Sequence, residues 1–313
     1  MNGSDEQPSL GSGPTARLTD PVDSTSPLTC LSDPQTPTSV APLPAVQHGR
    51  ARQLRGKLSE RDLAVLGALH RLRLLRGDQV MRLCVADGSP STQARRARAL
   101  LKRLSDLGLI VRLSRSVGGV RAGSSGHVCG LSGLGQAVLA VNGPYGQRRR
   151  RVWDTKPHFQ DHVLAVAELY VQLVEKEREE AIELLTFDAE PAAWRRFPGR
   201  GGMMVTLKPD AYIRIGIGEV ERSAFIELDM GTESLPTVQR KCMVFIAYWQ
   251  SGLEQQQHGV FPSVVWLVPN AERRDRLSGV IQRLAAEARY LFAVALQSDG
   301  PALLTAPVAG ETA

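Results

Sequence analysis

Pro209-Asp210-Ala-Tyr-Ile-Arg-Ile215 and, after a short loop, Ala224-Phe-Ile-Glu-Leu-Asp229 are the two segments that decide the fold of this chain. Their β-branched and aromatic residues predict two adjacent apolar strands. Glu227 and Asp229 are two residues apart on one strand, so they project from the same face, and Asp210 lies where the other strand begins. A divalent-metal site for phosphodiester cleavage requires such carboxylates. We therefore name Asp210, Glu227 and Asp229 as candidate catalytic residues and candidate ligands of Mg²⁺ or Mn²⁺.

Lys241 is the candidate cation for the same site. Cleavage also needs a positive charge near the scissile group, and Lys241 lies on a helix predicted to begin at Pro236, soon after the acidic strand. The alternative is structural: Asp210 caps a turn, Asp229 ends a strand and Lys241 is solvated. Each residue alone fits that alternative, and the set of four favours a site.

The rest of the second half predicts a mixed α/β fold around a central sheet. Helical spacing of apolar residues marks helices, and short apolar runs mark strands. We expect helices at 159–179, 236–249 and 272–288, and strands at 182–187, 203–207 continuing to 215, 224–229, 264–268 and 291–296. The tail after Ser298 is expected to be loose.

The first half predicts a winged helix, a relative of the helix-turn-helix. Ser59 with Asp62 three residues later is an N-cap signature that opens a first helix, and Gly108 is placed to end a third one. A second helix is expected from about Arg76 and a final one at 134–141. Apolar runs at 109–113 and 127–131 flank a Gly-rich turn and predict a hairpin. Three helices followed by a hairpin is the winged-helix order.

The predicted third helix, from 91 to 107, carries the candidate DNA-binding face. Ala94, Ala97, Leu101 and Leu104 form one stripe at helical spacing, and the opposite arc is cationic. Such a helix suits the major groove of duplex DNA; the alternative is a surface helix with incidental arginines. The candidate DNA-binding residues are Arg95, Arg96, Arg98, Lys102 and Arg103 on the helix, and Arg112, Arg115 and Arg121 on the wing.

The charge distribution agrees with a polyanionic partner. Residues 51–151 contain 20 basic and 5 acidic side chains, whereas residues 152–313 contain 16 basic and 22 acidic ones. A compact basic segment binds phosphates through counterion release. Codon bias toward Arg is the alternative, but it would not leave the second half acidic.

Residues 142–157 are expected to be a basic linker between the two halves. Within it, Arg148–Arg151 either contact a DNA backbone or form a solvated hinge.

Further sequence features bear on the N-terminal tail, the cellular compartment and the oligomeric state. The Ser/Thr/Pro-rich segment 1–56 is expected to be a disordered tail, and the N-terminus has no secretory signal. The sequence contains no run of about 18 apolar residues, so no membrane span is expected. The four scattered cysteines show neither zinc nor disulfide spacing, so we expect a cytoplasmic protein. A dimer is compatible with the pattern, but no heptad supports one. His158 and His162 are four apart without the Glu of zinc proteases, which favours a capping or core role.

The chain resembles a known family in five segments. They are Ser59-Glu-Arg-Asp-Leu-Ala-Val-Leu66, Gln79-Val-Met-Arg-Leu83, Gly118-Gly-Val-Arg-Ala-Gly-Ser124, Phe225-Ile-Glu-Leu-Asp-Met-Gly-Thr-Glu-Ser234 and Phe261-Pro-Ser-Val-Val-Trp-Leu-Val-Pro269. These are similar to the replication-relaxation family, found mostly in actinobacteria and their plasmids or integrative elements. The resemblance covers about 57–296. It implies a winged helix at 57–141, a restriction-endonuclease-like domain at 158–297, and a role in plasmid or mobile-element replication beside replication or transfer proteins.

The chain departs from the nuclease pattern, PD-(D/E)xK, at one position. Pro209-Asp210 and Glu227 match, but Asp229 stands where Lys is expected. Either Lys241 takes over from the following helix, or the site is degenerate. Glu168 is the candidate for the helical acid that often completes such sites. Two hypotheses follow: a DNA-binding protein whose nuclease-like domain is degenerate or weak, and a Mg²⁺-dependent endonuclease or nickase.

Overall fold

The computed structural model describes residues 45–113, 127–141 and 157–306. Predictions that fall on Arg115, Arg121, the basic run Arg148–Arg151 and residues 1–44 lie outside these ranges.

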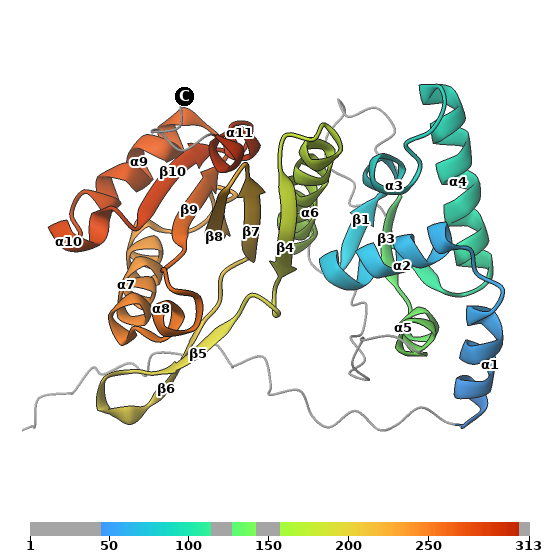
Figure 1. The fold of residues 1–313 in the computed structure, drawn as a ribbon, viewed down its shortest axis with the longest axis horizontal. Helices are drawn as coiled ribbons and strands as arrows, with labels where there is room; N and C mark the ends of the chain where they lie inside the picture. The colour runs from blue at the N-terminus through green and yellow to red at the C-terminus, as the bar shows by residue number, and fades with distance from the viewer. Residues whose placement is uncertain (1–44, 114–126, 142–156, 307–313) are drawn as a thin grey trace, which may run out of the picture. The chain divides into compact units, whose positions relative to one another are not determined.

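A mixed five-stranded sheet forms the centre of the second half, as the apolar runs predict (Figure 1). Its order is β10-β9-β8-β7-β4, with β10, β9 and β8 parallel and β8, β7 and β4 antiparallel. The strands are β4 (Glu183–Ala189), β7 (Ala211–Ile217), β8 (Val220–Leu228), β9 (Ser263–Val268) and β10 (Phe292–Leu296).

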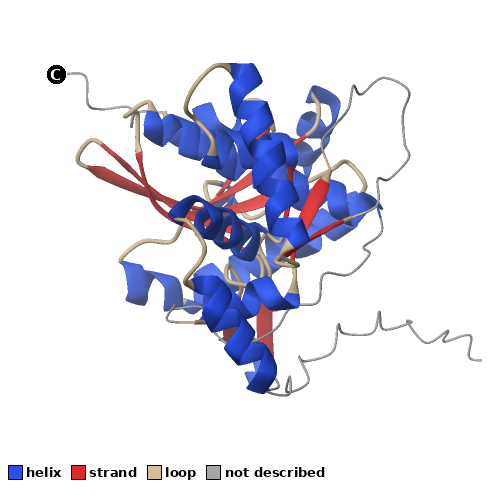
Figure 2. Ribbon diagram, turned by 90° about the vertical axis from the view of Figure 1, so that its right-hand side faces the viewer, coloured by secondary structure: helices blue, strands red, loops and turns tan. Residues whose placement is uncertain are grey.

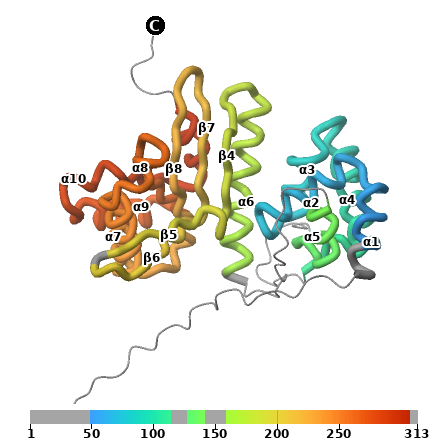
Figure 3. Tube along the Cα trace, turned by 60° about the horizontal axis from the view of Figure 1, so that its bottom comes forward, coloured from blue at the N-terminus to red at the C-terminus, as the bar shows by residue number. Residues whose placement is uncertain are grey.

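Helices cover both faces of this sheet (Figure 2). Alternate residues point to opposite sides of a strand, so Ile213, Ile226 and Val265 join one apolar cluster while Phe225 and Trp266 join the other. Helix α6 (Pro157–Arg178) packs on the first face and runs along β4 (Figure 3). Helices α7 (Leu235–Ser251), α9 (Ala271–Ile281) and α10 (Ala286–Arg289) cover the second.

The first half contains the three predicted helices and the predicted hairpin. These are α2 (Glu60–Leu72), α3 (Gly77–Cys84), α4 (Pro90–Asp106), β2 (Ile110–Arg112) and β3 (Val128–Leu131), followed by α5 (Gly133–Ala140). Ser59 and Asp62 form the predicted capping box at the start of α2. Gly108 follows α4 with φ of 72°, the left-handed conformation that ends many helices. A third strand, β1 (Leu74–Arg76), pairs with β3, and its three residues are too few to be recognised from sequence.

Several elements differ from the predictions. Residues 45–55, within the predicted tail, form α1 (Ala45–Arg55), which packs against α5 and fully buries Ala51. The predicted strand from 203 to 215 divides into β6 (Met204–Leu207) and β7, because Pro209 between them has no N–H for a ladder. β6 pairs instead with β5 (Arg195–Pro198) in a separate sheet, across the short 3₁₀ turn η1 (Arg200–Gly202). The predicted helix 272–288 breaks between α9 and α10. Within the described ranges, two further helices were not predicted: α8 (Leu253–His258), and α11 (Gly300–Thr305) in the tail that was expected to be loose.

Residues 42–313 belong to one compact unit. Within it, α3 packs directly against α6, where Arg82 makes ion pairs with Glu168 and Glu175 and Gln79 donates to the Leu164 carbonyl at 3.0 Å. The boundaries 57–141 and 158–297 stay predictions. None of the helices in the described ranges combines the length and apolar character needed to cross a membrane.

Candidate functional site

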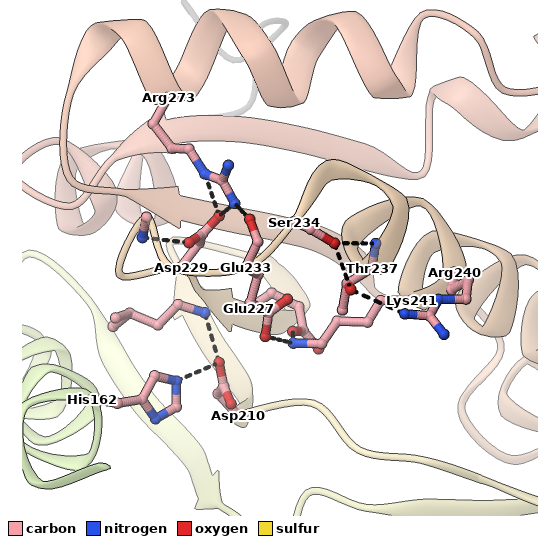
Figure 4. Close-up of polar contacts among 12 residues, drawn as sticks. His162, Asp210, Glu227, Asp229, Glu233, Ser234, Thr237, Arg240, Lys241 and Arg273 are labelled. Atoms are coloured by element: carbon pink, nitrogen blue, oxygen red, sulfur yellow. Dashed lines mark hydrogen bonds and ion pairs between the residues drawn. The ribbon is translucent and has the colours of Figure 1, made fainter. Parts of the chain in front are cut away.

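The candidate site lies where β7 begins and β8 ends. Ala211 of β7 is opposite Ile226 of β8, so the residue before the first and the residue after the second, Asp210 and Glu227, come next in the antiparallel register. Helix α7 begins soon after β8, with Ser234 as its N-cap and Pro236 in its first turn. This short return brings Lys241 back over the end of the strand (Figure 4).

Asp210 is held by the backbone and by a histidine. The Leu228 amide donates to Asp210 Oδ2 at 2.7 Å, and Nε2 of His162, on α6, lies 3.1 Å from the same oxygen. Burial alone would lower the pKa of His162, but the hydrogen bond and charge of Asp210 outweigh it and raise that pKa above its ordinary value. Contact with Asp210 therefore favours the charged form of the His162 imidazole.

Glu227 shares a cation with a second glutamate. Lys241 Nζ lies 2.9 Å from Glu227 Oε2 and 2.8 Å from Glu233 Oε1, and 5.6 Å from the centre of the Trp266 ring. Glu227 is buried, and this burial together with the nearby Asp210 carboxylate raises its pKa to about 8, against the opposing effect of Lys241. The structure thus places Lys241 among the acids, in contact with Glu227 and Glu233.

Asp229 has a different partner. Although it is on the same side of the sheet as Glu227, its Oδ2 accepts from Nε of Arg273, on α9, at 2.7 Å, and its Oδ1 accepts from the Gly231 amide at 2.5 Å. Both Asp229 and Arg273 are buried. Of the four predicted residues, Asp210, Glu227 and Lys241 therefore come together, whereas Asp229 is bound in a neighbouring ion pair (Figure 4).

The arrangement is a poor fit to a prearranged metal centre with three carboxylates. Protein cations already neutralise the candidate ligands: Lys241 lies on Glu227, Arg273 on Asp229 and His162 on Asp210. In the described ranges, no three His, Cys, Asp or Glu side chains are grouped so that they could hold a metal ion. The cluster consists of a lysine and a histidine beside the buried Glu227 and the partly buried Asp210.

Glu168 lies apart from this cluster. Its carboxylate makes ion pairs with Arg82 and Arg76 and accepts from Gln79 at 3.0 Å, all from the first half of the chain. Glu168, the candidate for the helical acid, thus links α6 to α3 through these contacts.

The basic face of α4 is exposed, as its pattern predicts. Ala97, Leu101 and Leu104 are buried, and the cations opposite them face solvent. Two of these have carboxylate partners: Lys102 pairs with Asp106 at 2.6 Å, and Arg103 pairs with the buried Asp62 of α2. Within the described ranges, the other predicted DNA-binding residues make no ion pair; these are Arg95, Arg96, Arg98 and Arg112.

Three residues of the site were not predicted from the sequence. His162 was expected to cap or join the core, and its spacing from Asp210 carries no signal. Glu233 and Arg273 reach the site only because α7 and α9 cover the same face of the sheet. For Glu233, its position just before the N-cap of the lysine-bearing helix was the one available hint.

Comparisons with known proteins identify the family. The family described as replication-relaxation matches residues 66–264, a range that contains α4, Asp210, Glu227 and Lys241. A search of curated proteins found no match, and neither did a search of solved structures. The family match covers well over half of the 313 residues. The chain therefore belongs to the replication-relaxation family.

Proposed function

We propose that this chain is a DNA-binding protein that acts in the replication of a plasmid or mobile element. The family description associates the chain with replication. In this proposal α2, α3, α4 and the β2–β3 hairpin form a winged helix that docks on duplex DNA, and the five-stranded sheet with its helices is a nuclease-like domain. Replication or transfer proteins are the expected partners, in the cytoplasm.

The observation that carries the proposal is the face of α4. Arg95, Arg96 and Arg98 are exposed on the side opposite the buried stripe, and no carboxylate within the described ranges neutralises them. Cations on a helix that have no carboxylate partner suit phosphate and base-edge contacts, since their charge is not neutralised by an acid of the described ranges.

The nuclease-like domain is proposed to be catalytically degenerate or weak. Asp229 occupies the position of the strand lysine and forms a buried ion pair with Arg273. The remaining carboxylates, Asp210 and Glu227, already face His162 and Lys241. Such a site is suited to holding the strand ends together.

Charge reversal on α4 tests DNA binding. Arg96→Glu combined with Arg98→Glu should lower affinity for a fluorescent duplex at least tenfold near 0.1 M salt, as judged by anisotropy. Arg276→Glu combined with Arg283→Glu is the matched control, because it changes net charge equally at exposed positions in and after α9. Equal loss in both double variants, or no loss in either, would remove α4 from the interface.

One observation favours a second candidate, metal-dependent DNA nicking. Asp210, Glu227 and Lys241 come together even though Lys is absent from the strand. Supercoiled plasmid incubated with the protein and Mg²⁺ or Mn²⁺ separates the two candidates. Nicked circles that disappear in Asp210→Ala would establish cleavage; intact plasmid together with tight binding supports the degenerate domain.

A further inference from the structure

A two-stranded arm lies outside the central sheet and is not used by the proposed function. We call residues 195–207, which comprise β5, η1 and β6, the β5–β6 arm. Its strands pair only with each other, and they lie apart from the five-stranded sheet (Figures 1 and 3). Strand β6 leads through Lys208 and Pro209 directly into Asp210, so the base of the arm adjoins the candidate site.

One face of the arm is anchored. Phe197 and Leu207 are buried in the cluster that also contains Tyr248 of α7, and the rings of Phe197 and Tyr248 are 5.1 Å apart. At the base, Arg195 donates to the buried Glu254 at 3.2 Å and lies over the Tyr212 ring at 4.6 Å. The arm is therefore mounted firmly at its base, which suits it to present its other face in a fixed direction.

The other face carries a cation and two apolar side chains. Arg196 pairs with Thr206 and Pro198 with Met204, and strand alternation directs these residues away from the anchored face. Met204 is 64% exposed and its neighbour Met203 is 75% exposed, the highest value among the large hydrophobic residues of the described ranges. An adjacent pair of exposed methionines beside a turn is unusual for a surface that contacts only water.

Charge favours nucleic acid as the occupant. Residues 191–209 contain four basic residues, Arg195, Arg196, Arg200 and Lys208, and no acidic one. Arg195 is paired with Glu254 on the anchored face, whereas Arg196 and Lys208 are exposed. The basic residues of the arm need negatively charged partners. Phosphates line both sides of every DNA groove, whereas a protein partner would present acidic residues at these positions only by chance. A two-stranded ribbon fits a groove, and proteins that bend DNA insert Met or Pro side chains between base steps of the minor groove.

We propose that the β5–β6 arm is a second DNA-binding element, with Arg196 and Lys208 on phosphates and the tip residues Met203, Met204 and Pro198 wedged into the minor groove. The inference rests on the proposed function, because it takes the same duplex as partner. DNA held by α4 and by the arm is bent at the tip.

Removal of the two methionines tests the wedge. Met203→Ala combined with Met204→Ala should lower duplex affinity about fivefold or more, because stacking contacts are lost. Bending by the wild-type protein should raise energy transfer between dyes at the two ends of a duplex of about 30 bp, and the double variant should abolish this rise. The salt dependence should stay unchanged, since no charge is removed. Met243→Ala is the control, because Met243 is 53% exposed on α7 outside the arm. Arg196→Ala should instead reduce the salt slope by about one.

Each outcome decides the inference. Binding and bending equal to wild type in the double methionine variant overturn it while leaving the proposed function standing. A wild-type protein that ignores DNA overturns both. If the double variant instead changes the sedimentation of the DNA-free protein, the arm contacts a second copy of the chain and the inference is wrong. Thermal melting of all variants confirms that these exposed substitutions leave the fold intact.

Discussion

At the scale of single residues, the candidate site is a set of acids neutralised by protein cations. Lys241 Nζ lies 2.9 Å from Glu227, and whether it replaces the missing strand lysine stays a prediction. The contact of Asp229 with Arg273 could not be anticipated, because no sequence spacing relates β8 to α9. The sequence indicated which residues could form the site, but it did not indicate which side chains they contact across the sheet.

Lys241→Met should destabilise the protein by about 2 kcal/mol in urea denaturation. It leaves the Glu233 carboxylate without its cation and the buried Glu227 without its hydrogen-bond donor, and breaking a fully buried pair costs roughly 3–5 kcal/mol. The smaller value is expected because 35% of the Lys241 side chain is exposed and screened. Arg240→Met, at the exposed neighbouring position on α7, should change stability by less than about 0.5 kcal/mol. Equal effects in both variants would contradict the ion-pair assignment.

The raised pKa of Glu227 predicts how stability depends on pH. Its pKa rises from 4.5 to about 8 on folding, so the folded state binds this proton more tightly than the unfolded state. The associated stability is full below pH 4.5 and is lost as pH rises through 8; the raised pKa of His162 acts in the same direction. We expect the free energy of unfolding to fall between about pH 5 and pH 9.

Glu227→Gln should flatten that fall, as followed by urea denaturation at several pH values. Glu272→Gln is the control, since the Glu272 side chain is 82% exposed. A profile for Glu227→Gln that parallels the wild type would show that Glu227 does not carry the effect.

At the scale of elements, local signals were predictable and long-range pairing was not. The capping box of α2 and the glycine after α4 depend on residues within a few positions of each other, so the sequence contains them in full. Strands β1 and β5 are stabilised by partners elsewhere in the chain, and short strands without alternation carry no periodicity to recognise. The turn of the predicted wing, residues 114–126, lies outside the described ranges.

Gly135→Ala should destabilise the protein by roughly 1–3 kcal/mol, through overpacking between α5 and the β2–β3 hairpin. A Cβ at Gly135 would lie 2.2 Å from the Leu109 carbonyl oxygen and 2.7 Å from a methyl group of Leu131. Gly133→Ala, on the same helix, meets nothing within 4 Å and should be neutral or slightly stabilising. Thermal melting of the two variants compares them directly. A neutral Gly135→Ala would mean that α5 packs less closely than described.

At the scale of the whole molecule, the two halves share one core. A single apolar cluster contains Leu66 and Leu104 from the first half and Ile213 and Ile226 from the sheet. Arg82, with its ion pairs to Glu168 and Glu175, joins α3 to α6 beside this cluster. Unfolding is therefore expected to be cooperative across both halves.

Arg82→Glu should separate the unfolding of the two halves. All four tryptophans lie at or after position 153, so their fluorescence reports the second half, whereas far-UV circular dichroism reports both. In the wild type the two urea transitions should coincide; in Arg82→Glu, like charges face Glu168 and Glu175 and the midpoints should part. Arg61→Glu, at an exposed ion pair with Asp87, is the control. Coincident transitions in Arg82→Glu would show that apolar contact alone couples the halves.

DNA binding is the central claim, and the salt dependence of duplex affinity measures it most directly. Each phosphate neutralised contributes about −0.9 to the slope of log affinity against log salt concentration. We expect a steep slope for the wild-type protein, and a slope shallower by about two units for Arg96→Glu combined with Arg98→Glu. The absence of any duplex binding at low ionic strength, or an unchanged slope in that variant, would contradict this account.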